Sequence, residues 1–368
     1  MGNSFGNIFR ITTFGESHGA GLGVIIDGCP AGLEITEKEI QFELDRRRPG
    51  QSKITTSRKE PDQVQILSGI KDGVTLGTSI GLMIPNSDAK SSSYDNLAEL
   101  YRPSHADYTY DARYGLRDHR GGGRASNRET AARVAAGAIA KKLLSVLCGA
   151  QALAWVESIH EIGSRVNPES VTLEAIEANA VRCPDQDAAK IMFDAVAKAK
   201  SEGNSLGGII AFRVKGLPAG LGSPVFDKIT ATISHALMSI PATRSIGFGL
   251  GESASRMKGS DHNDPLILKD GRVATPDNRA GGVLGGITSG EDLYGRLSFK
   301  PTATLFLEQQ TLTSKLEPVS FKAQGRHDPC VVPRAAPIVE AMLHLVLADE
   351  LLSFSIANVD RLKNALHG

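Results

Sequence analysis

Residues 118–147 place the firmest constraint on the fold, because three consecutive glycines run directly into an alanine-rich segment. The glycines at 121–123 break regular structure and let the backbone approach a ligand closely. Good helix formers follow, so the pattern predicts a helix that runs to about Leu147 and begins with a capping box between Ser126 and Glu129. A helix N-terminus that faces a glycine loop favours a bound anion.

Arginines gather around this predicted helix start, and cations in a first turn oppose the helix dipole. A helix selected only for stability would carry Asp or Glu there. A solvated basic face is the usual outcome for a run of like charges. We interpret this run instead as the binding site of a multiply charged anion, which would relieve the repulsion between Arg113, Arg117, Arg120, Arg124, Arg128 and Arg133.

The composition restricts the class of protein that can carry such a site. The 368 residues include 41 Lys and Arg and 41 Asp and Glu, so the net charge is zero and a general nucleic-acid-binding surface is not expected. Four cysteines without a Cys-x-x-Cys pair argue against a structural zinc site or a disulfide scaffold, and they fit a reducing cytosol. The N-terminus lacks the apolar core of a signal peptide, and no stretch is apolar enough to span a bilayer. We therefore expect a cytoplasmic globular protein that uses no metal and contacts no membrane.

Strand-like and helix-like patterns follow one another along the whole chain. Runs of strands with long helices between them predict helices packed against sheets. The expected strands are residues 9–14, 22–27, 63–69, 78–84, 150–162, 206–215 and 296–300, and the expected long helices include 185–202 and 333–353. The polar stretches 85–101 and 253–279 are expected to be a flexible loop and a mobile flap.

Several short segments carry side chains suited to acid–base chemistry or to phosphate binding. His18 follows a strand, His105 lies two residues before Asp107, and Asp328 follows an Arg-His pair. Each has an ordinary structural alternative, such as a turn histidine bonded to the backbone or a local Asp-Pro turn. The arginines at 46–48 suit a helix C-terminus as well as a phosphate.

From the residues alone, two functional classes remain open. The first is an enzyme that acts on a phosphorylated small molecule with a phosphorylated cofactor. The second is a non-catalytic RNA- or nucleotide-binding module that uses the arginines between 113 and 133. Zero net charge and 5% aromatic residues weigh against the second class.

Six motifs in the same order resemble those of the chorismate synthase family, in its bacterial form without a flavin-reductase region. The resemblance extends from Asn3 to at least Ala336. The motifs are Gly-Glu-Ser-His-Gly at 15–19, Arg-Arg-Arg-Pro-Gly at 46–50, Arg-Pro-Ser-His-Ala-Asp at 102–107, Gly-Gly-Gly-Arg-Ala-Ser-Asn-Arg-Glu-Thr-Ala at 121–131, Gly-Gly-Val-Leu-Gly-Gly at 281–286 and Arg-His-Asp-Pro-Cys at 326–330.

This resemblance implies a fold and a reaction. The fold would be an α+β sandwich of the β-α-β type, with helices between two antiparallel sheets, in one domain covering residues 1–368 and assembled as a homotetramer. The reaction would be the 1,4-trans elimination of phosphate from 5-enolpyruvylshikimate 3-phosphate to give chorismate. The family requires reduced FMN without net redox change, here supplied from an external source, and FAD and NADP are also associated with it.

The resemblance also implies roles for individual residues. His18 would protonate the departing phosphate, His105 would protonate or stabilise the reduced flavin near N1, and Asp328 would assist deprotonation through flavin N5. The substrate would be bound by Ser17, Arg48, Arg102, Arg128 and Arg326. The flavin would be held by Arg48, Lys53, Arg124, Ala125, Ser126, Pro241, Ala242, Gly286, Lys300, Pro301, Thr302, Ala303, Thr304 and Arg326.

Three positions depart from the family pattern. Pro241 stands where Asn is common, which puts a side-chain contact to the flavin there in doubt but keeps a backbone contact. Asn127 stands where Ala or Ser is frequent, and Lys53 where Arg is frequent. None of these changes removes a group with an implied catalytic role.

Overall fold

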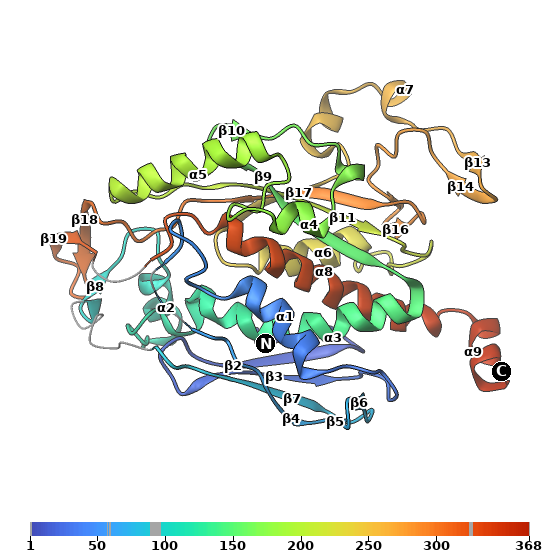
Figure 1. The fold of residues 1–368 in the computed structure, drawn as a ribbon, viewed down its shortest axis with the longest axis horizontal. Coiled ribbons are helices and arrows are strands. Elements are labelled where there is room, and N and C mark those ends of the chain that lie inside the picture. The colour runs from blue at the N-terminus through green and yellow to red at the C-terminus, as the bar shows by residue number, and fades with distance from the viewer. Residues whose placement is uncertain (1, 57, 59, 89–96, 324–326, 368) are drawn as a thin grey trace.

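Two antiparallel five-stranded sheets enclose a layer of helices in the computed structural model (Figure 1). The structure describes residues 2–56, 58, 60–88, 97–323 and 327–367. Part of the predicted loop 85–101, and Arg326, therefore lie outside the described residues. The main hydrophobic cluster includes Leu22 from one sheet, Phe212 from the other and Leu343 from a helix between them.

The first sheet has the strand order β1-β2-β3-β7-β4. Its central strands bury every second side chain against the helices, as a half-buried sheet requires. On β3 these are Leu22, Val24 and Ile26, which are 0–1% exposed. The strands are β1 (Ser4–Phe5), β2 (Arg10–Gly15), β3 (Gly21–Asp27), β7 (Ile80–Pro85) and β4 (Gln65–Ser68).

The second sheet has the order β10-β9-β11-β17-β12 and is covered on both faces. On β9, Ala154 and Val156 face the helix layer, whereas Trp155 joins a small outer cluster with Ile176. A register shift lies between Ile209 and Ile210 on β11. The strands are β10 (Ile162–Gly163), β9 (Gln151–Ile159), β11 (Gly208–Lys215), β17 (Leu293–Phe299) and β12 (Thr243–Phe248).

The helix layer contains α1 (Glu37–Arg47), α3 (Thr130–Cys148), α6 (Ile229–Met238) and α8 (Val332–Ser355). Helix α3 packs on β3 and α8 packs on β9, and these two helices contact each other extensively. Their approach is close because Gly137 lies on α3, where an added Cβ would come within 2.5 Å of the Ala341 Cβ. The alanine-rich composition of α3 thus lets a helix be buried on nearly all sides. The predicted α+β sandwich is confirmed.

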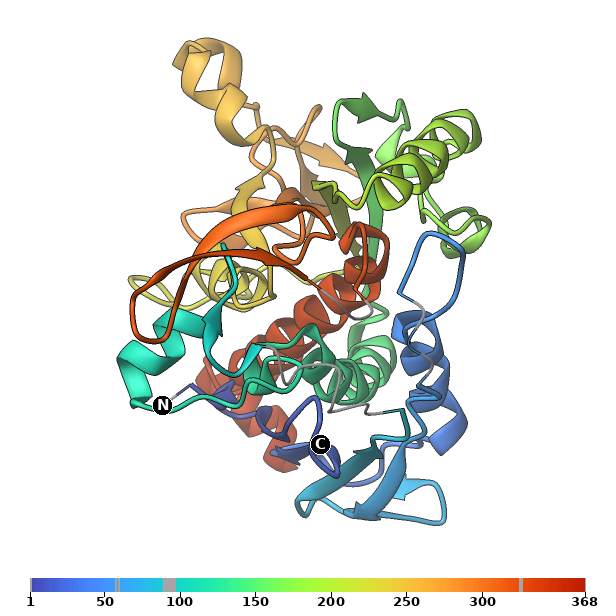
Figure 2. The same ribbon diagram turned by 90° about the vertical axis from the view of Figure 1, so that its left-hand side faces the viewer.

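Smaller elements surround these three layers. The segment with α7 (Gly259–His262) and the hairpin of β13 (Ile267–Lys269) and β14 (Arg272–Ala274) projects from the second sheet, away from the first (Figures 1 and 2). The remaining elements are β5 (Ile70–Lys71), β6 (Val74–Thr75), β8 (Leu100–Tyr101), α2 (Asp107–Tyr114), α4 (Leu173–Glu177), α5 (Gln186–Ser201), β15 (Val283–Leu284), β16 (Ile287–Thr288), β18 (Glu308–Thr313), β19 (Pro318–Lys322) and α9 (Val359–His367).

The predicted capping box at the start of α3 is wrong. The Ser126 hydroxyl accepts from Arg128 N at 3.4 Å and begins a 3-10 turn, and α3 starts only at Thr130. Glu129 does not turn back to Ser126, because its carboxylate pairs with Arg133 at 2.8 Å. No helix within the described ranges has the length and apolar content needed to cross a membrane.

Candidate active site

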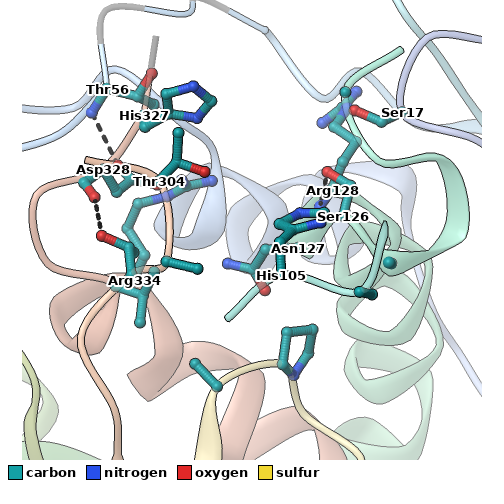
Figure 3. Close-up of a pocket in the computed structure, with 18 of the residues that line it drawn as sticks. Ser17, Thr56, His105, Ser126, Asn127, Arg128, Thr304, His327, Asp328 and Arg334 are labelled. Carbon is teal, nitrogen blue, oxygen red and sulfur yellow. Dashed lines mark hydrogen bonds and ion pairs between the residues drawn. The ribbon is translucent and has the colours of Figure 1, made fainter. Parts of the chain in front are cut away.

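A cavity of about 330 Å³ lies where the ends of several elements meet (Figure 3). Its walls come from the loop after β2, the end of α1 and the segment that follows it, the loop before α2 and the glycine loop before α3. The turn before β12, the loop after β17, and the start of α8 with the loop before it complete them. The lining residues are Ser17, Arg47, Pro49, Thr56, Arg58, Arg102, Ser104, His105, Ala106, Gly121, Ala125, Ser126, Asn127, Arg128, Pro241, Ala242, Lys300, Pro301, Thr302, Ala303, Thr304, His327, Asp328, Val331 and Arg334.

Most residues predicted to form the site line this one cavity. They come from six motifs or loops that are far apart in the sequence. They are Ser17, Arg102, His105, Ala125, Ser126, Arg128, Pro241, Ala242, Lys300, Pro301, Thr302, Ala303, Thr304 and Asp328. Their roles toward substrate or flavin stay predictions.

His18 lies at the edge of the cavity and is half-buried. A Cβ added to Gly121 would come within 2.3 Å of the His18 ring, so the ring packs against the backbone of the glycine loop. Gly121 itself lines the cavity and has a φ of +62°. The glycine is therefore required both by its backbone conformation and by the neighbouring imidazole.

Four other predicted residues are not among the lining residues of the cavity. Arg48 is 49% exposed and lies 3.8 Å from Asp45. Lys53 is exposed, and Arg124 donates to the carbonyl of Gly15 and to Thr13. Gly286, in the turn between β15 and β16, packs against Lys228.

Cationic side chains outnumber carboxylates in the described lining. Arg47, Arg58, Arg102, Arg128, Arg334 and Lys300 are all present, against the single carboxylate of Asp328. Arg128 is 4% exposed, and its Nη2 has no hydrogen-bond partner among the described residues; Glu60 Oε2 lies 4.0 Å away. A buried donor without a partner is costly, and an anion in the cavity would satisfy it.

A buried carboxylate behind the cavity wall holds two of these arginines. Asp62 accepts from Arg47 Nη1 at 2.9 Å through one oxygen and pairs with Arg128 through the other. Burial lowers the pKa of the Arg47 guanidinium to about 10, although Asp62 raises it. Arg47 is therefore still protonated at neutral pH. Arg58 is held separately, because Glu60 accepts from it at 2.7 Å and Ser17 Oγ accepts from its Nη1 at 3.2 Å.

His105 and Asp328 stand on opposite sides of the cavity (Figure 3). His105 Nδ1 lies 3.0 Å from Asp107 Oδ1. Burial lowers the pKa of the His105 imidazole, and Arg102 and Lys300 lower it further, although the contact with Asp107 opposes them. The imidazole is therefore neutral at neutral pH when the cavity holds no ligand.

The carboxylate of Asp328 is fixed at both oxygens. Thr56 N donates to Oδ1 at 2.8 Å, and Arg334 Nη1 pairs with Oδ2. The Thr302 hydroxyl donates to the Asp328 carbonyl at 2.9 Å, which ties the loop after β17 to the same residue. Lys300 Nζ donates to the carbonyl of Ser104 at 2.8 Å and so connects this loop to the His105 side of the cavity.

The structure corrects the explanation for the arginines around α3. Their repulsion is relieved mainly by carboxylates within the chain, and most of them do not face a common ligand. Arg117 pairs with Asp107 and Asp111, Arg120 with Asp118, and Arg133 with Glu129. Of the six, Arg128 alone is among the described lining residues.

Some lining residues were not predicted from the sequence. Arg47 was passed over for its neighbour Arg48, although its spacing from Ile40 and Leu44 places it on the buried face of α1. Arg334 could have been found, since a charge inside the apolar start of α8 has to be paired when it is buried. Arg58, Thr56, Asn127 and His327 had no comparable signal. Within the described part of the chain, no group of three or more His, Cys, Asp or Glu is placed to hold a metal ion.

The two-sheet sandwich with one strongly cationic cavity defines an α+β protein that is arranged to bind a small polyanion. Comparison with known proteins is more specific, because the family model described as chorismate synthase matches residues 9–352. The chain is 54% identical to the chorismate synthase of Gloeothece citriformis over 353 residues, which are 96% of this chain and 98% of that protein. The chorismate synthase of Akkermansia muciniphila is also 54% identical, with the same coverage of both chains.

A solved structure gives the same result at the level of the fold. The protein described as "Crystal Structure of Chorismate Synthase" superposes with a TM-score of 0.74 at 31% identity, covering 98% of this chain and 97% of the other. This chain belongs to the chorismate synthase family.

Proposed function

We propose that this protein is a carbon–oxygen lyase that acts on a phosphate ester. It would eliminate phosphate from 5-enolpyruvylshikimate 3-phosphate in the 1,4-trans sense to give chorismate, with reduced FMN and no net redox change. The observation that carries the proposal is that one cavity of a chorismate synthase family member gathers six cationic side chains together with His105 and Asp328.

The cation set suits the charge of this substrate, which carries one phosphate and two carboxylates. Planar guanidinium groups bind such oxyanions with two parallel hydrogen bonds. Arg128 offers an Nη2 without a hydrogen-bond partner among the described residues, and Arg58 and Arg47 line the same cavity. The same charges would stabilise the negative charge that develops on the departing phosphate.

The cavity also has donors that suit a phosphorylated cofactor with a hydroxylated chain. Lys300, Thr304 and Ser126 offer an ammonium group and two hydroxyls. The Pro241–Ala242 turn lines the same cavity, and the Ala242 carbonyl accepts from Lys300 N at 2.9 Å. We assign these residues and Ala125 to FMN. When bound, reduced FMN would supply transient electron donation to the substrate and N5 as a proton-accepting position.

We assign the proton transfers of the reaction to His105, Asp328 and His18. Neutral His105 can accept a proton or a hydrogen bond from a bound ligand, and anionic ligands would raise its pKa again. Asp328 is a fixed acceptor on the opposite wall. His18, at the cavity edge, is assigned to protonation of the leaving phosphate.

An anaerobic assay tests this function directly. The protein is mixed with photoreduced FMN and 5-enolpyruvylshikimate 3-phosphate, and chorismate absorbance and released phosphate are followed together. We expect equal amounts of both products, and none with oxidised FMN. Absence of both products from a protein shown to be folded by circular dichroism would refute the proposal.

Cofactor and substrate should also bind in one shared pocket. A titration with reduced FMN is expected to give tighter binding when the substrate is present than when it is absent. We further propose a cytoplasmic homotetramer that receives its reduced flavin from an external source. Sedimentation equilibrium tests the tetramer, and a mass of one or two chains would contradict it.

A further inference from the structure

Asp107 is a buried carboxylate that does not line the cavity but contacts two residues that do. Its Oδ1 lies 3.0 Å from His105 Nδ1 and accepts from Arg102 Nη2 at 2.8 Å. Its Oδ2 accepts from Arg102 Nε at 2.8 Å and from Arg102 N at 3.0 Å. Arg117 Nη1 lies 3.3 Å from Oδ1. The Asp107 carboxylate, on the first turn of α2, thus holds two lining residues, His105 and Arg102, next to each other.

The protonation state of Asp107 follows from these contacts. Burial alone would raise the pKa of its carboxyl group, but hydrogen bonds from Arg102 and His105 hold that pKa well below its usual range. Asp107 is therefore ionised and can only accept hydrogen bonds. For the contact at 3.0 Å to be a hydrogen bond, His105 must carry its proton on Nδ1.

The other edge of the imidazole faces the glycine loop. A Cβ added to Gly122 would lie 3.1 Å from His105 Cε1 and 3.4 Å from Nε2, so a side chain at this position would crowd the edge that carries Nε2. The loop that carries His105 is pinned from the opposite side by Lys300, through the carbonyl of Ser104. The ring therefore has little freedom to turn over.

We propose that Asp107 is the positioning residue of His105: it fixes the imidazole as the Nδ1–H tautomer and leaves Nε2 as the only nitrogen that exchanges a proton with a bound ligand. Arg102 is part of the same device, because its Nε, Nη2 and backbone N are all committed to Asp107. Two of its five guanidinium N–H donors are used by Asp107, which leaves both hydrogens of Nη1 and one of Nη2 for a ligand. Arg117, 3.3 Å from Asp107 Oδ1, is a second cation beside this carboxylate. This inference rests on the proposed function for its kinetic consequence, but its structural content can be tested without turnover.

The structural content is tested by nitrogen-15 NMR of the full-length protein with labelled histidine, at a pH where His105 is neutral. The signals of His105 are assigned from their loss in His105→Gln, since the chain contains 9 histidines. We expect the protonated nitrogen to be Nδ1. A neutral His105 with its proton on Nε2 would overturn the inference, whether or not the protein is active.

The kinetic content is tested with Asp107→Asn, measured by both NMR and anaerobic turnover. The amide oxygen is expected to stay with Arg102, which places an N–H donor beside Nδ1 and moves the ring proton to Nε2. We expect kcat to fall by about 10- to 100-fold with KM changed less than about twofold, since a general acid or base contributes roughly 10²–10⁴ to a rate. An unchanged tautomer, an unchanged kcat or an effect on KM alone would each overturn the assignment.

The matched control is Asp111→Asn, the same substitution one turn later on α2. Asp111 accepts from Arg117 Nε at 3.0 Å and is not among the described lining residues. In this variant we expect the tautomer of His105 and the value of kcat to match those of the wild type. Equal losses in both variants would show that α2 had merely been loosened and would overturn the specific role of Asp107. If wild type itself fails to form chorismate, the proposed function fails, while the NMR result still decides the tautomer.

Discussion

Arg47 Nη1 and Asp62 Oδ2 form an ion pair of 2.9 Å in which the two side chains are 1% and 0% exposed. The second oxygen of Asp62 pairs with Arg128. Asp62 thus bridges Arg47, in the last turn of α1, and Arg128, in the 3-10 turn before α3. A single carboxylate therefore aligns two arginines of the cavity wall. Removal of this carboxylate would leave both buried guanidinium charges without their carboxylate partner, which is strongly destabilising.

Replacement of this carboxylate should therefore be costly for folding. Asp62→Ala leaves two buried guanidinium groups without their main partner, and we expect the free energy of unfolding to fall by about 3–5 kcal/mol. Urea denaturation measures this loss. Asp45→Ala is the control, because Asp45 is 48% exposed and faces Arg48 at 3.8 Å; its cost should be roughly 0.5 kcal/mol. Similar small losses in both variants would contradict the structural role of Asp62.

Arg128 should contribute mainly to substrate binding. Arg128→Lys keeps the charge but removes the planar donor set, including the Nη2 that has no hydrogen-bond partner in the described structure. Loss of a hydrogen bond to a charged group costs about 1.5–3 kcal/mol, so we expect KM for the substrate to rise roughly 10- to 100-fold. Steady-state kinetics measures this rise. Arg120→Lys, in the same loop but 48% exposed and paired with Asp118, should leave KM unchanged; a rise of similar size there would argue against a specific subsite.

The two histidines of the site should contribute to turnover. We expect His18→Ala and His105→Ala each to lower kcat by roughly 10- to 1,000-fold, the range expected when general acid help is lost. Anaerobic stopped-flow assays measure the rate. His262→Ala, on the projecting helix α7, is the control and should be as active as wild type. Normal rates in both site variants would refute the roles assigned to them.

The free energy of unfolding should decrease as the pH is lowered, because of a buried histidine on α8. His344 Nε2 accepts from Ala152 N at 3.3 Å, and burial lowers the pKa of its imidazole to about 3, below the 6.5 of an exposed histidine. Between these values the unfolded chain binds a proton that the folded chain does not, so stability decreases as the pH falls from about 6.5. Above that pH this residue adds no pH dependence.

Urea denaturation at several pH values between 7.5 and 5 is the measurement for His344. His344→Gln keeps an acceptor for Ala152 N and is expected to have a weaker pH dependence than wild type. His160→Asn, at an exposed position with a φ of +54° that Asn tolerates, should keep the wild-type dependence. An identical pH profile for wild type and His344→Gln would show that His344 is not the titrating group.

Features that depend on neighbouring residues were predicted well. The strand at residues 22–27 appears as β3 (Gly21–Asp27), and the helix at 333–353 appears as α8 (Val332–Ser355). Alternation and apolar runs report which face of an element is buried, and that information is local. The start of α3 shows the limit of local information. Ser126 and Glu129 have the spacing of a capping box, but the Glu129 carboxylate pairs with Arg133 instead of the Ser126 backbone.

The cavity shows the same limit at longer range. The family resemblance predicted that His105, Arg128 and related residues, among them Lys300 and Asp328, form one site, although nothing in their spacing requires them to meet. Arg46, Arg47 and Arg48 are adjacent, yet their side chains have three different surroundings. Arg46 pairs with Glu340 at 2.5 Å, Arg47 with Asp62, and Arg48 is half-exposed.

Local chemistry along the chain was thus sufficient for the strands, the long helices and the kinds of side chain that a polyanion site needs. Only the packed structure decided which arginine faces the cavity, which carboxylate neutralises it and which nitrogen of His105 contacts Asp107. The physical reason is the range of the forces. Helix and strand preferences act over a few residues, whereas a buried charge is stable only beside a partner that packing delivers, and for Arg46 that partner lies 294 positions further along the chain.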